Sequence, residues 1–203
     1  MALISIDNIS CDTIIGIWKK EENIDLLESV FELNKTEKNE YEKISNETRK
    51  IEWLLVRILL TEILQKRVSI EYNKNKKPSI TNSDLNISVS HSRNFVTIIT
   101  SETNFSGIDV EEIAERVGKV KHKFLNNDEL AWCKTLEQQT ACWSAKEAVF
   151  KLHEKNLDFH DMVVSPFDVD GYNGKFKLSV IKPGKESMYV INYRRIENDL
   201  IAY

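Results

Sequence analysis

Apolar residues alternate with polar ones in several short runs, a pattern that predicts β-strands. Residues 3–6 and 14–18 form the first two runs, and residues 85–89 and 95–99 form a second pair separated by a short turn. Alternation with a period of two places successive side chains on opposite faces of a sheet, so that one face can be buried. The second pair has the spacing of a β-hairpin.

Between these pairs, the apolar spacing changes to three and four residues and predicts helices. A charged stretch over residues 35–50 is expected to be helical and solvated, and it leads into a stronger helix. A turn rich in lysine and asparagine follows at residues 73–78. The apolar face of the stronger helix consists of Ile51, Leu54, Leu55, Ile58 and Leu59.

Strand and helix patterns return in the second half of the chain. Residues 107–111 alternate as a strand. Asn126 and Glu129 have the spacing of a capping box, which predicts a helix that begins near Asp128. A second helix is predicted from about residue 139 to residue 155.

Two further alternating runs, at residues 176–180 and 189–193, predict strands near the C-terminus. Asn173-Gly174 and Pro183-Gly184 are dipeptides typical of turns, and we expect them between these strands. Because both halves of the chain combine strands with helices, the sequence predicts an α+β fold.

The length and composition of the chain allow two such halves. It has 203 residues, of which 41% are apolar and 30% charged, as in an ordinary soluble protein with a buried core. We expect an N-terminal α+β half over residues 1–104 and a C-terminal α+β half over residues 105–203, packed side by side.

Charge, cysteine content and hydropathy exclude several classes of protein. The formal net charge of −4 argues against non-specific nucleic-acid binding, which depends on lysine and arginine. Cys11, Cys133 and Cys142 form no C-x-x-C pair and indicate reduced thiols in a cytoplasmic protein. The N-terminus does not resemble a signal peptide. The longest apolar run, residues 53–60, contains Arg57 and is too short to span a membrane.

Two carboxylates in the strand at residues 107–111 are the first candidates for chemistry. Asp109 and Glu111 are two residues apart and therefore share a face of the strand, whereas Ile108 and Val110 point toward the core. This pattern fits either half of a site for a hard cation such as Mg²⁺, or an edge strand with a solvated outer face.

The helix around residue 146 carries three charges on one side. Lys146, Glu147 and Lys151 share that side with Trp143 and Phe150, opposite a face rich in alanine. A purely solvated face does not normally carry a tryptophan and a phenylalanine, so we expect these charges to line a cavity. The alternative is a surface ion pair between Glu147 and Lys151, which are four residues apart.

Hydrogen-bond donors also cluster at the end of the strand near residue 90. Ser90, His91 and Ser92 offer several donors that suit a phosphate group. A hydrolase nucleophile is the alternative, but no G-x-S-x-G motif accompanies the serines.

Together these motifs resemble the signature of the 4′-phosphopantetheinyl transferases. The strand motif Gly-Ile-Asp-Val-Glu at residues 107–111 is followed by Trp-Ser-Ala-Lys-Glu-Ala-Val-Phe-Lys at residues 143–151. Upstream, Lys77-Pro78 and the Ser-His-Ser run at residues 90–92 match the usual approach to this signature. The resemblance covers roughly residues 51–152.

The resemblance implies an activity, a fold and partners. Members of the family transfer phosphopantetheine from coenzyme A to a serine of an acyl-, peptidyl- or aryl-carrier protein and release adenosine 3′,5′-bisphosphate. Such carriers serve fatty acid, polyketide or nonribosomal peptide biosynthesis. Because the Gly-Ile-Asp motif lies far from the N-terminus, the chain is similar to the long, surfactin-synthetase-activating type, a monomeric pseudo-dimer of two α+β halves.

The same resemblance implies roles for the charged residues of the second half. Asp109, Glu111 and Glu147 are expected to coordinate Mg²⁺, with Mn²⁺ as an alternative ion, beside the coenzyme A pyrophosphate. Glu147, or a water on the metal, would take the proton of the carrier serine. Lys151 would stabilise phosphate charge in the transition state, and Lys146 would add a pyrophosphate contact.

In the first half, the resemblance implies a coenzyme A site. Ser90 and His91 are expected to bind the 3′-phosphate or the nearby diphosphate, and Lys77-Pro78 to line the adenine pocket. Arg49 is expected to give a further 3′-phosphate contact, for which Lys50 would serve equally well.

Two other functions remain open at this point. A non-catalytic protein that binds coenzyme A or a carrier would keep the same fold. A nucleotide-dependent phosphotransferase of another family is disfavoured because the sequence contains no G-x-x-x-x-G-K-[ST] loop. The basic segment at residues 116–123 either docks an acidic carrier, with Val117, Val120 and Phe124 adding apolar contacts, or is a solvated loop.

Overall fold

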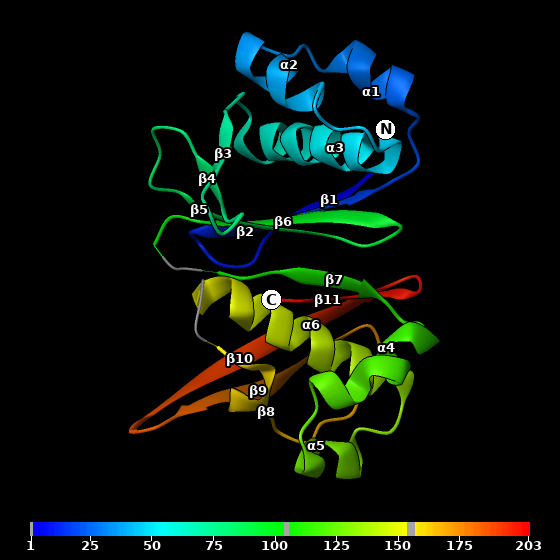
Figure 1. Ribbon diagram of the computed structural model, residues 1–203, viewed down its shortest axis with the longest axis vertical. Helices are drawn as coiled ribbons and strands as arrows, with labels where there is room; N and C mark the ends of the chain where they lie inside the picture. The colour runs from blue at the N-terminus through cyan, green and yellow to red at the C-terminus, as the bar shows by residue number, and fades with distance from the viewer. Residues whose placement is uncertain (1, 104–105, 154–156) are drawn as a thin grey trace. The chain divides into compact units, whose positions relative to one another are not determined.

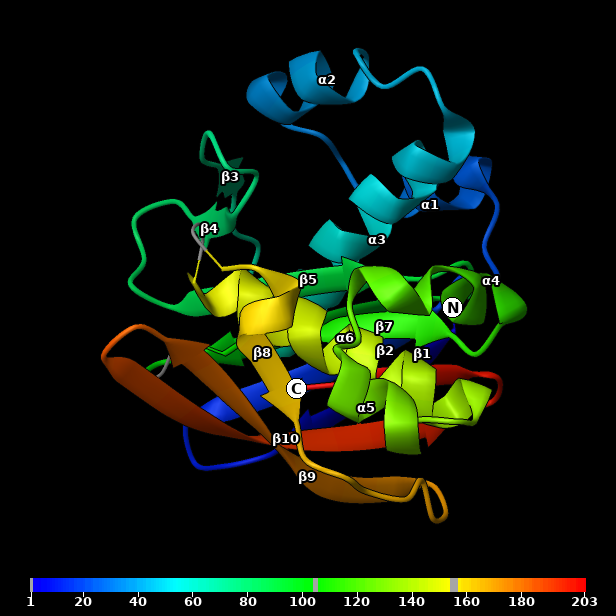
Figure 2. The same ribbon diagram turned by 60° about the horizontal axis from the view of Figure 1, so that its bottom comes forward.

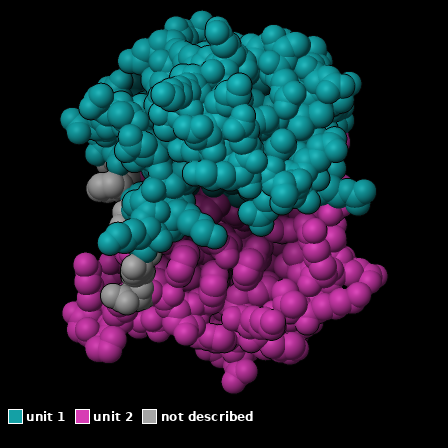
Figure 3. Space-filling model, turned by 45° about the horizontal axis from the view of Figure 1, so that its top comes forward, with its two compact units in different colours: residues 1–104 teal, residues 105–203 magenta. Residues whose placement is uncertain are grey.

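The computed structural model describes residues 2–103, 106–153 and 157–203. The chain divides into two compact units, residues 1–104 and 105–203, which are coloured separately in Figure 3. Residues 104 and 105, at the predicted boundary between the halves, lie outside the described residues. Each unit combines an antiparallel sheet with an 18-residue helix, so the predicted α+β fold class is confirmed.

The first unit packs helices against one face of a four-stranded antiparallel sheet (Figure 1). The strand order is β1-β2-β6-β5, and a separate hairpin pairs β3 with β4. Helix α3 packs against β2 and β6 through apolar residues such as Leu55 and Leu59, both fully buried. The elements are β1 (Leu3–Asn8), β2 (Thr13–Lys19), α1 (Ile24–Val30), α2 (Lys35–Tyr41), α3 (Glu47–Leu64), β3 (Ile70–Tyr72), β4 (Pro78–Ile80), β5 (Asn86–His91) and β6 (Phe95–Ser101).

Asparagine side chains set the helix boundaries in this unit. The charged stretch predicted as one helix over residues 35–50 is divided, because α2 ends at Tyr41 and Asn46 caps a new helix by accepting a hydrogen bond from the Arg49 amide at 3.0 Å. Asn34 caps α2 in the same way and forms a capping box with Glu37. The short helix α1 and the β3–β4 hairpin were not predicted.

The second unit contains a five-stranded antiparallel sheet with the order β7-β11-β10-β9-β8. Helix α6 packs against β11 and β7, and Figure 2 shows β8, β9 and β10 side by side. The elements are β7 (Asp109–Glu112), α4 (Glu115–Val120), the 3₁₀ turn η1 (Lys121–Lys123), α5 (Asn127–Trp132), α6 (Leu136–His153), η2 (Phe159–Asp161), β8 (Met162–Val164), β9 (Asn173–Lys182), β10 (Lys185–Ile196) and β11 (Asp199–Ala202).

Most predicted elements of the second unit are present, with two differences. The capping box of Asn126 and Glu129 opens α5 as predicted. Helix α6 begins at Leu136, three residues earlier than expected, and the predicted end at residue 155 lies outside the described residues. The turn predicted at Asn173-Gly174 is wrong, because both residues pair with β10 inside strand β9.

No helix among the described residues is both long enough and apolar enough to cross a membrane.

Candidate functional site

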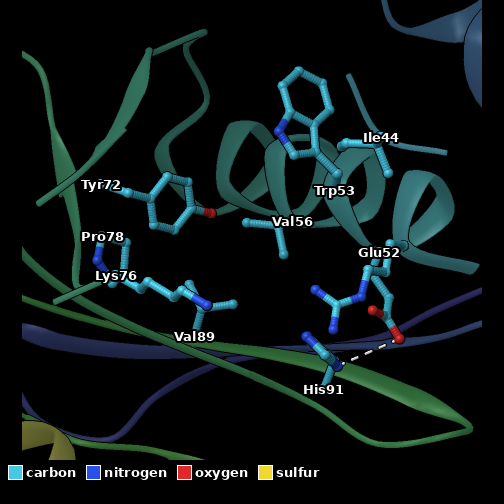
Figure 4. Close-up of a pocket in the computed structure, with 10 residues that line it drawn as sticks. Ile44, Glu52, Trp53, Val56, Tyr72, Lys76, Pro78, Val89 and His91 are labelled. Atoms are coloured by element: carbon cyan, nitrogen blue, oxygen red, sulfur yellow. Dashed lines mark ion pairs between the residues drawn. The ribbon is translucent and has the colours of Figure 1, made fainter. Parts of the chain in front are cut away.

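A pocket of about 450 Å³ opens in the first unit between α3, the β3–β4 hairpin and β5 (Figure 4). Its walls combine aromatic and apolar side chains with several charges. This composition suits a ligand that has both a planar ring and anionic groups. The pocket is lined by Ile44, Arg49, Glu52, Trp53, Val56, Tyr72, Lys76, Pro78, Val89 and His91.

Of the five residues predicted to bind coenzyme A in the first half of the chain, three line this pocket and two do not. Arg49, Pro78 and His91 belong to the lining, whereas Lys77 and Ser90 are absent from the set of described residues that form it. Ser90 lies between two lining residues on β5, and alternation turns its side chain to the opposite, buried face of the strand.

Between the two cations that the sequence left open, the structure favours Arg49. Lys50 is not among the described lining residues, and its ammonium nitrogen lies 4.8 Å from the centroid of the Tyr41 ring.

Sequence reasoning did not assign the other lining residues to the site, and three of them are informative: two could have been found from their spacing, and one could not. Glu52 and Trp53 lie three and four positions after Arg49, on the same face of α3. The third, Tyr72, comes from the hairpin that was not predicted, so only the tertiary structure could place it.

Charges in the pocket leave an excess of cations. The Nδ1 atom of His91 lies 3.3 Å from Oε1 of Glu52, the contact that is dashed in Figure 4. The same oxygen accepts a hydrogen bond from Nζ of Lys20 at 2.8 Å. Because Lys20 also pairs with Glu52, Arg49 and Lys76 leave the lining with a positive charge that can attract an anion.

In the second unit, strand β7 and helix α6 bring together the predicted acidic residues. Asp109 and Glu111 lie on β7, an edge strand, while Ile108 and Val110 are buried as predicted. Burial is the main cause that raises the pKa of Glu147, and the charge of Asp109 adds to it, with a smaller contribution from Glu111. These three carboxylates are therefore close enough to influence one another.

Basic residues accompany two of the carboxylates. Nζ of Lys151 lies 3.0 Å from Oδ1 of Asp109 and donates a second hydrogen bond to the carbonyl oxygen of Ile108 at 2.7 Å. Arg116 pairs with Glu111. Burial raises the pKa of Glu111, and the charge of Arg116 acts in the opposite direction.

The donor set has the chemistry that a hard cation needs, although its carboxylates are not gathered into a preformed group. Carboxylate oxygens are the ligands that Mg²⁺ prefers. Within the described ranges, however, no three His, Cys, Asp or Glu residues are grouped so that they could hold a metal ion.

A glycine allows β7 to approach α6 closely. A Cβ atom on Gly107 would lie 2.0 Å from the carbonyl oxygen of Ala148, so no larger residue fits there without a shift of the backbone. The two halves of the sequence signature therefore pack directly against each other at Gly107 and Ala148.

Lys146 does not join this group. Its side chain is fully buried, and Nζ donates to Glu129 at 2.7 Å and to the carbonyl oxygens of Phe124 and Phe159 at 2.6 and 3.3 Å. Because these three contacts use its donors inside the core, the structure does not support the predicted pyrophosphate contact. We therefore leave Lys146 out of the candidate site.

The basic segment at residues 116–123 is helical and is not a loop. It forms most of α4 and the turn η1. Val117 and Phe124 are buried in the core, and only Val120 of the three apolar residues is exposed. The predicted apolar contribution to carrier docking is therefore reduced to Val120.

Comparison with known proteins supports the resemblance for the second unit. Residues 106–191 match the family model of the 4′-phosphopantetheinyl transferase superfamily. The matched region contains Asp109, Glu111, Glu147 and Lys151. This part of the chain is thus similar to the 4′-phosphopantetheinyl transferases. No curated protein matches the chain.

Proposed function

We propose that the protein is a 4′-phosphopantetheinyl transferase of the long, surfactin-synthetase-activating type. It transfers phosphopantetheine from coenzyme A to a serine of an apo carrier protein and releases adenosine 3′,5′-bisphosphate. In this proposal the protein acts in the cytoplasm as a monomer, with its two units forming a pseudo-dimer.

The cluster of Asp109, Glu111, Glu147 and Lys151 carries this proposal. It lies inside the region that matches the family model, and a carboxylate group with an adjacent lysine suits a reaction at a pyrophosphate. Asp109, Glu111 and Glu147 would hold Mg²⁺, or Mn²⁺, and a bound ion would neutralise the pyrophosphate charge.

The reaction is a phosphoryl-type displacement. The serine oxygen of the carrier attacks the phosphorus that bears the pantetheine group, and the bond from this phosphorus to the bridging oxygen of the leaving nucleotide breaks. Glu147 takes the serine proton, unless a water does so in its place. Lys151 stabilises the negative charge on the leaving phosphate and can return a proton to it.

We assign the pocket of the first unit to the nucleotide end of coenzyme A. Trp53 and Tyr72 would contact the adenine ring beside Pro78, and Arg49 and His91 would bind the 3′-phosphate. The pocket volume of about 450 Å³ lies within the usual range for small-molecule sites.

One observation favours a second candidate, a non-catalytic protein that binds coenzyme A or a carrier. Asp109 and Glu111 are paired with Lys151 and Arg116, and the described residues contain no preformed metal group. A transferase must exchange these ion pairs for a metal ion, whereas a binding protein need not.

Mass spectrometry of an apo carrier protein tests the proposal. After incubation with the protein, coenzyme A and Mg²⁺, the carrier should gain one phosphopantetheine, a mass on the order of 340 Da. A parallel sample with EDTA should show no gain. If neither sample gains mass while calorimetry detects binding of coenzyme A or carrier, the binding protein is correct and the transferase is not.

A further inference from the structure

Arg57 is a cation in the interior of the first unit. It follows Trp53 by one turn of α3, and the residue is only 2% exposed. Its guanidinium carbon lies 3.2 Å from the centroid of the Trp53 ring, and Nη1 donates to the Trp53 carbonyl oxygen at 3.3 Å. A buried charge is costly unless its partners compensate for it, so these partners indicate what the residue does.

Helix α2 supplies the negative charges that balance Arg57. Its Nε lies 3.8 Å from Oε1 of Glu37, and its Nη2 lies 3.4 Å from Oε2 of Glu40. Glu37 also binds Arg67, at 2.6 Å. Two cations and two anions thus form a neutral cluster, which holds Arg57 in place from the side of α2.

On its other side, Arg57 reaches the pocket through Tyr72. The guanidinium and the Tyr72 hydroxyl are near enough for each group to influence the pKa of the other. Burial raises the pKa of Tyr72, and the positive charge of Arg57 acts in the opposite direction. Figure 4 shows the Tyr72 hydroxyl pointing toward Val56 of α3. One guanidinium therefore stacks on one aromatic residue of the pocket lining and lies near a second.

The hairpin that carries Tyr72 is held more firmly at one end than at the other. It has only two strands, which by themselves are marginally stable in water, and it packs against β5. Buried Ile70 and Ile80 pair at its base, whereas Tyr72 pairs with Pro78 next to the turn. Arg57 lies near the end of the hairpin that lines the pocket, away from this buried base.

We propose that Arg57 is a positioning residue for the nucleotide pocket. It holds Trp53 and Tyr72 in the orientation that the adenine ring of coenzyme A requires, although it does not line the pocket itself. This inference rests on the proposed function, since it concerns the affinity for coenzyme A. Without the guanidinium, coenzyme A would have to order these side chains on binding, and its affinity would fall.

Calorimetric titration with coenzyme A tests the proposal on Arg57→Lys, Tyr72→Phe and the double variant. Arg57→Lys should raise the Kd about tenfold, because lysine has no planar guanidinium to stack on Trp53, and Tyr72→Phe should raise it by a smaller factor. The double variant should raise the Kd by less than the product of the two single effects, because both changes weaken the interaction between Arg57 and Tyr72. In the transfer assay, the KM for coenzyme A should rise while kcat stays unchanged.

Arg67→Lys is the matched control. Arg67 binds the same Glu37 and stacks on Phe31 with its guanidinium carbon 4.2 Å from the ring centroid, but it is outside the described pocket lining. Its variant should lower the melting temperature and leave the Kd for coenzyme A unchanged. Tyr72→Phe alters a partly exposed residue and keeps the test valid if Arg57→Lys does not fold.

The outcomes distinguish failure of the Arg57 proposal from failure of the proposed function. If the wild-type protein binds coenzyme A and both Arg57→Lys and Tyr72→Phe bind it equally well, Arg57 has a purely structural role and the positioning proposal is wrong. Effects that add in the double variant would also overturn it. If the wild-type protein itself does not bind coenzyme A, the proposed function fails, and this proposal fails with it.

Discussion

Lys146 and Glu147 are adjacent on helix α6 but have different surroundings. Lys146 is fully buried and binds Glu129, whereas Glu147 is half-buried and lies beside Asp109 and Lys151. About 100° of rotation separates adjacent residues on an α-helix, which is enough to turn one side chain into the core and the next into the carboxylate cluster.

Replacement of Lys146 by methionine should destabilise the fold. The change leaves Glu129 buried without its cation, and loss of one partner from a buried pair costs about 3–5 kcal/mol. Urea unfolding should show this decrease in the free energy of unfolding. Addition of Glu129→Gln should recover part of the stability, because the uncompensated charge is then removed. A variant as stable as the wild type would show that the pair is not structural.

Replacement of Glu147 by glutamine should abolish transfer and keep the fold. The substitution preserves volume and removes a negative charge that burial and Asp109 already disfavour, so the melting temperature should stay unchanged or rise slightly. Turnover is followed by carrier mass spectrometry, and thermal unfolding is measured on the same sample. Turnover close to that of the wild type would remove Glu147 from the mechanism.

Packing between elements is most constrained where β7 meets α6. Gly107→Ala would place a Cβ atom 2.0 Å from the Ala148 carbonyl oxygen, which belongs to rigid helix backbone. The strand must therefore move, at a cost of about 1–3 kcal/mol or more, and the position of Asp109 relative to Glu147 changes with it. Both the melting temperature and the transfer rate should fall.

Gly118→Ala is the matched control for this change. The added Cβ atom would meet side-chain atoms of Gln139 and Leu136, at 3.0 and 3.1 Å, and these can adjust. Because Gly118 is inside helix α4, alanine also favours the helical conformation. We expect nearly unchanged stability and activity. Equal effects of both substitutions would argue against a special role for Gly107.

Local sequence signals predicted most helices and strands. Errors arose where contacts with residues distant in the sequence determine the local structure. The capping box of Asn126 and Glu129 needs only neighbouring residues, and it was identified correctly. Gly174 looks like a turn residue, but a Cβ atom there would lie 2.4 Å from the ring of Tyr193, so this glycine makes room for a tyrosine across the sheet. A sequence does not show such a partner.

The same distinction applies to the candidate site. Arg49, Glu52 and Trp53 share a helix face, so their joint position was readable from spacing alone. The contribution of Tyr72 depends on how the hairpin packs against α3, and the burial of Lys146 depends on Glu129, which lies on another helix. These placements follow from tertiary contacts and not from any local pattern.

At the scale of the whole molecule, net charge cannot explain attraction to an acidic carrier. The chain itself has a formal net charge of −4, so any electrostatic attraction must come from a local group of cations. Lys119 and Lys123, on α4 and η1, are exposed, and Lys119 has a long 4.0 Å contact with Glu115, whereas Arg116 pairs with Glu111 and Glu112. These two lysines are therefore the best candidates for a carrier-docking patch.

Reversal of both charges, in the variant Lys119→Glu with Lys123→Glu, should raise the KM for carrier several-fold through slower association. The KM for coenzyme A should not change, since neither lysine is among the described residues that line the pocket. The difference from the wild type should shrink with added salt, because the Debye length falls from ~10 Å at 0.1 M to ~3 Å at 1 M.

Lys175→Glu with Lys177→Glu, at exposed positions on β9, makes the same change in net charge and serves as the control. If both double variants raise the KM for carrier equally, only the total charge matters and the patch has no specific role. An unchanged KM for carrier at low salt would show that α4 and η1 do not take part in docking.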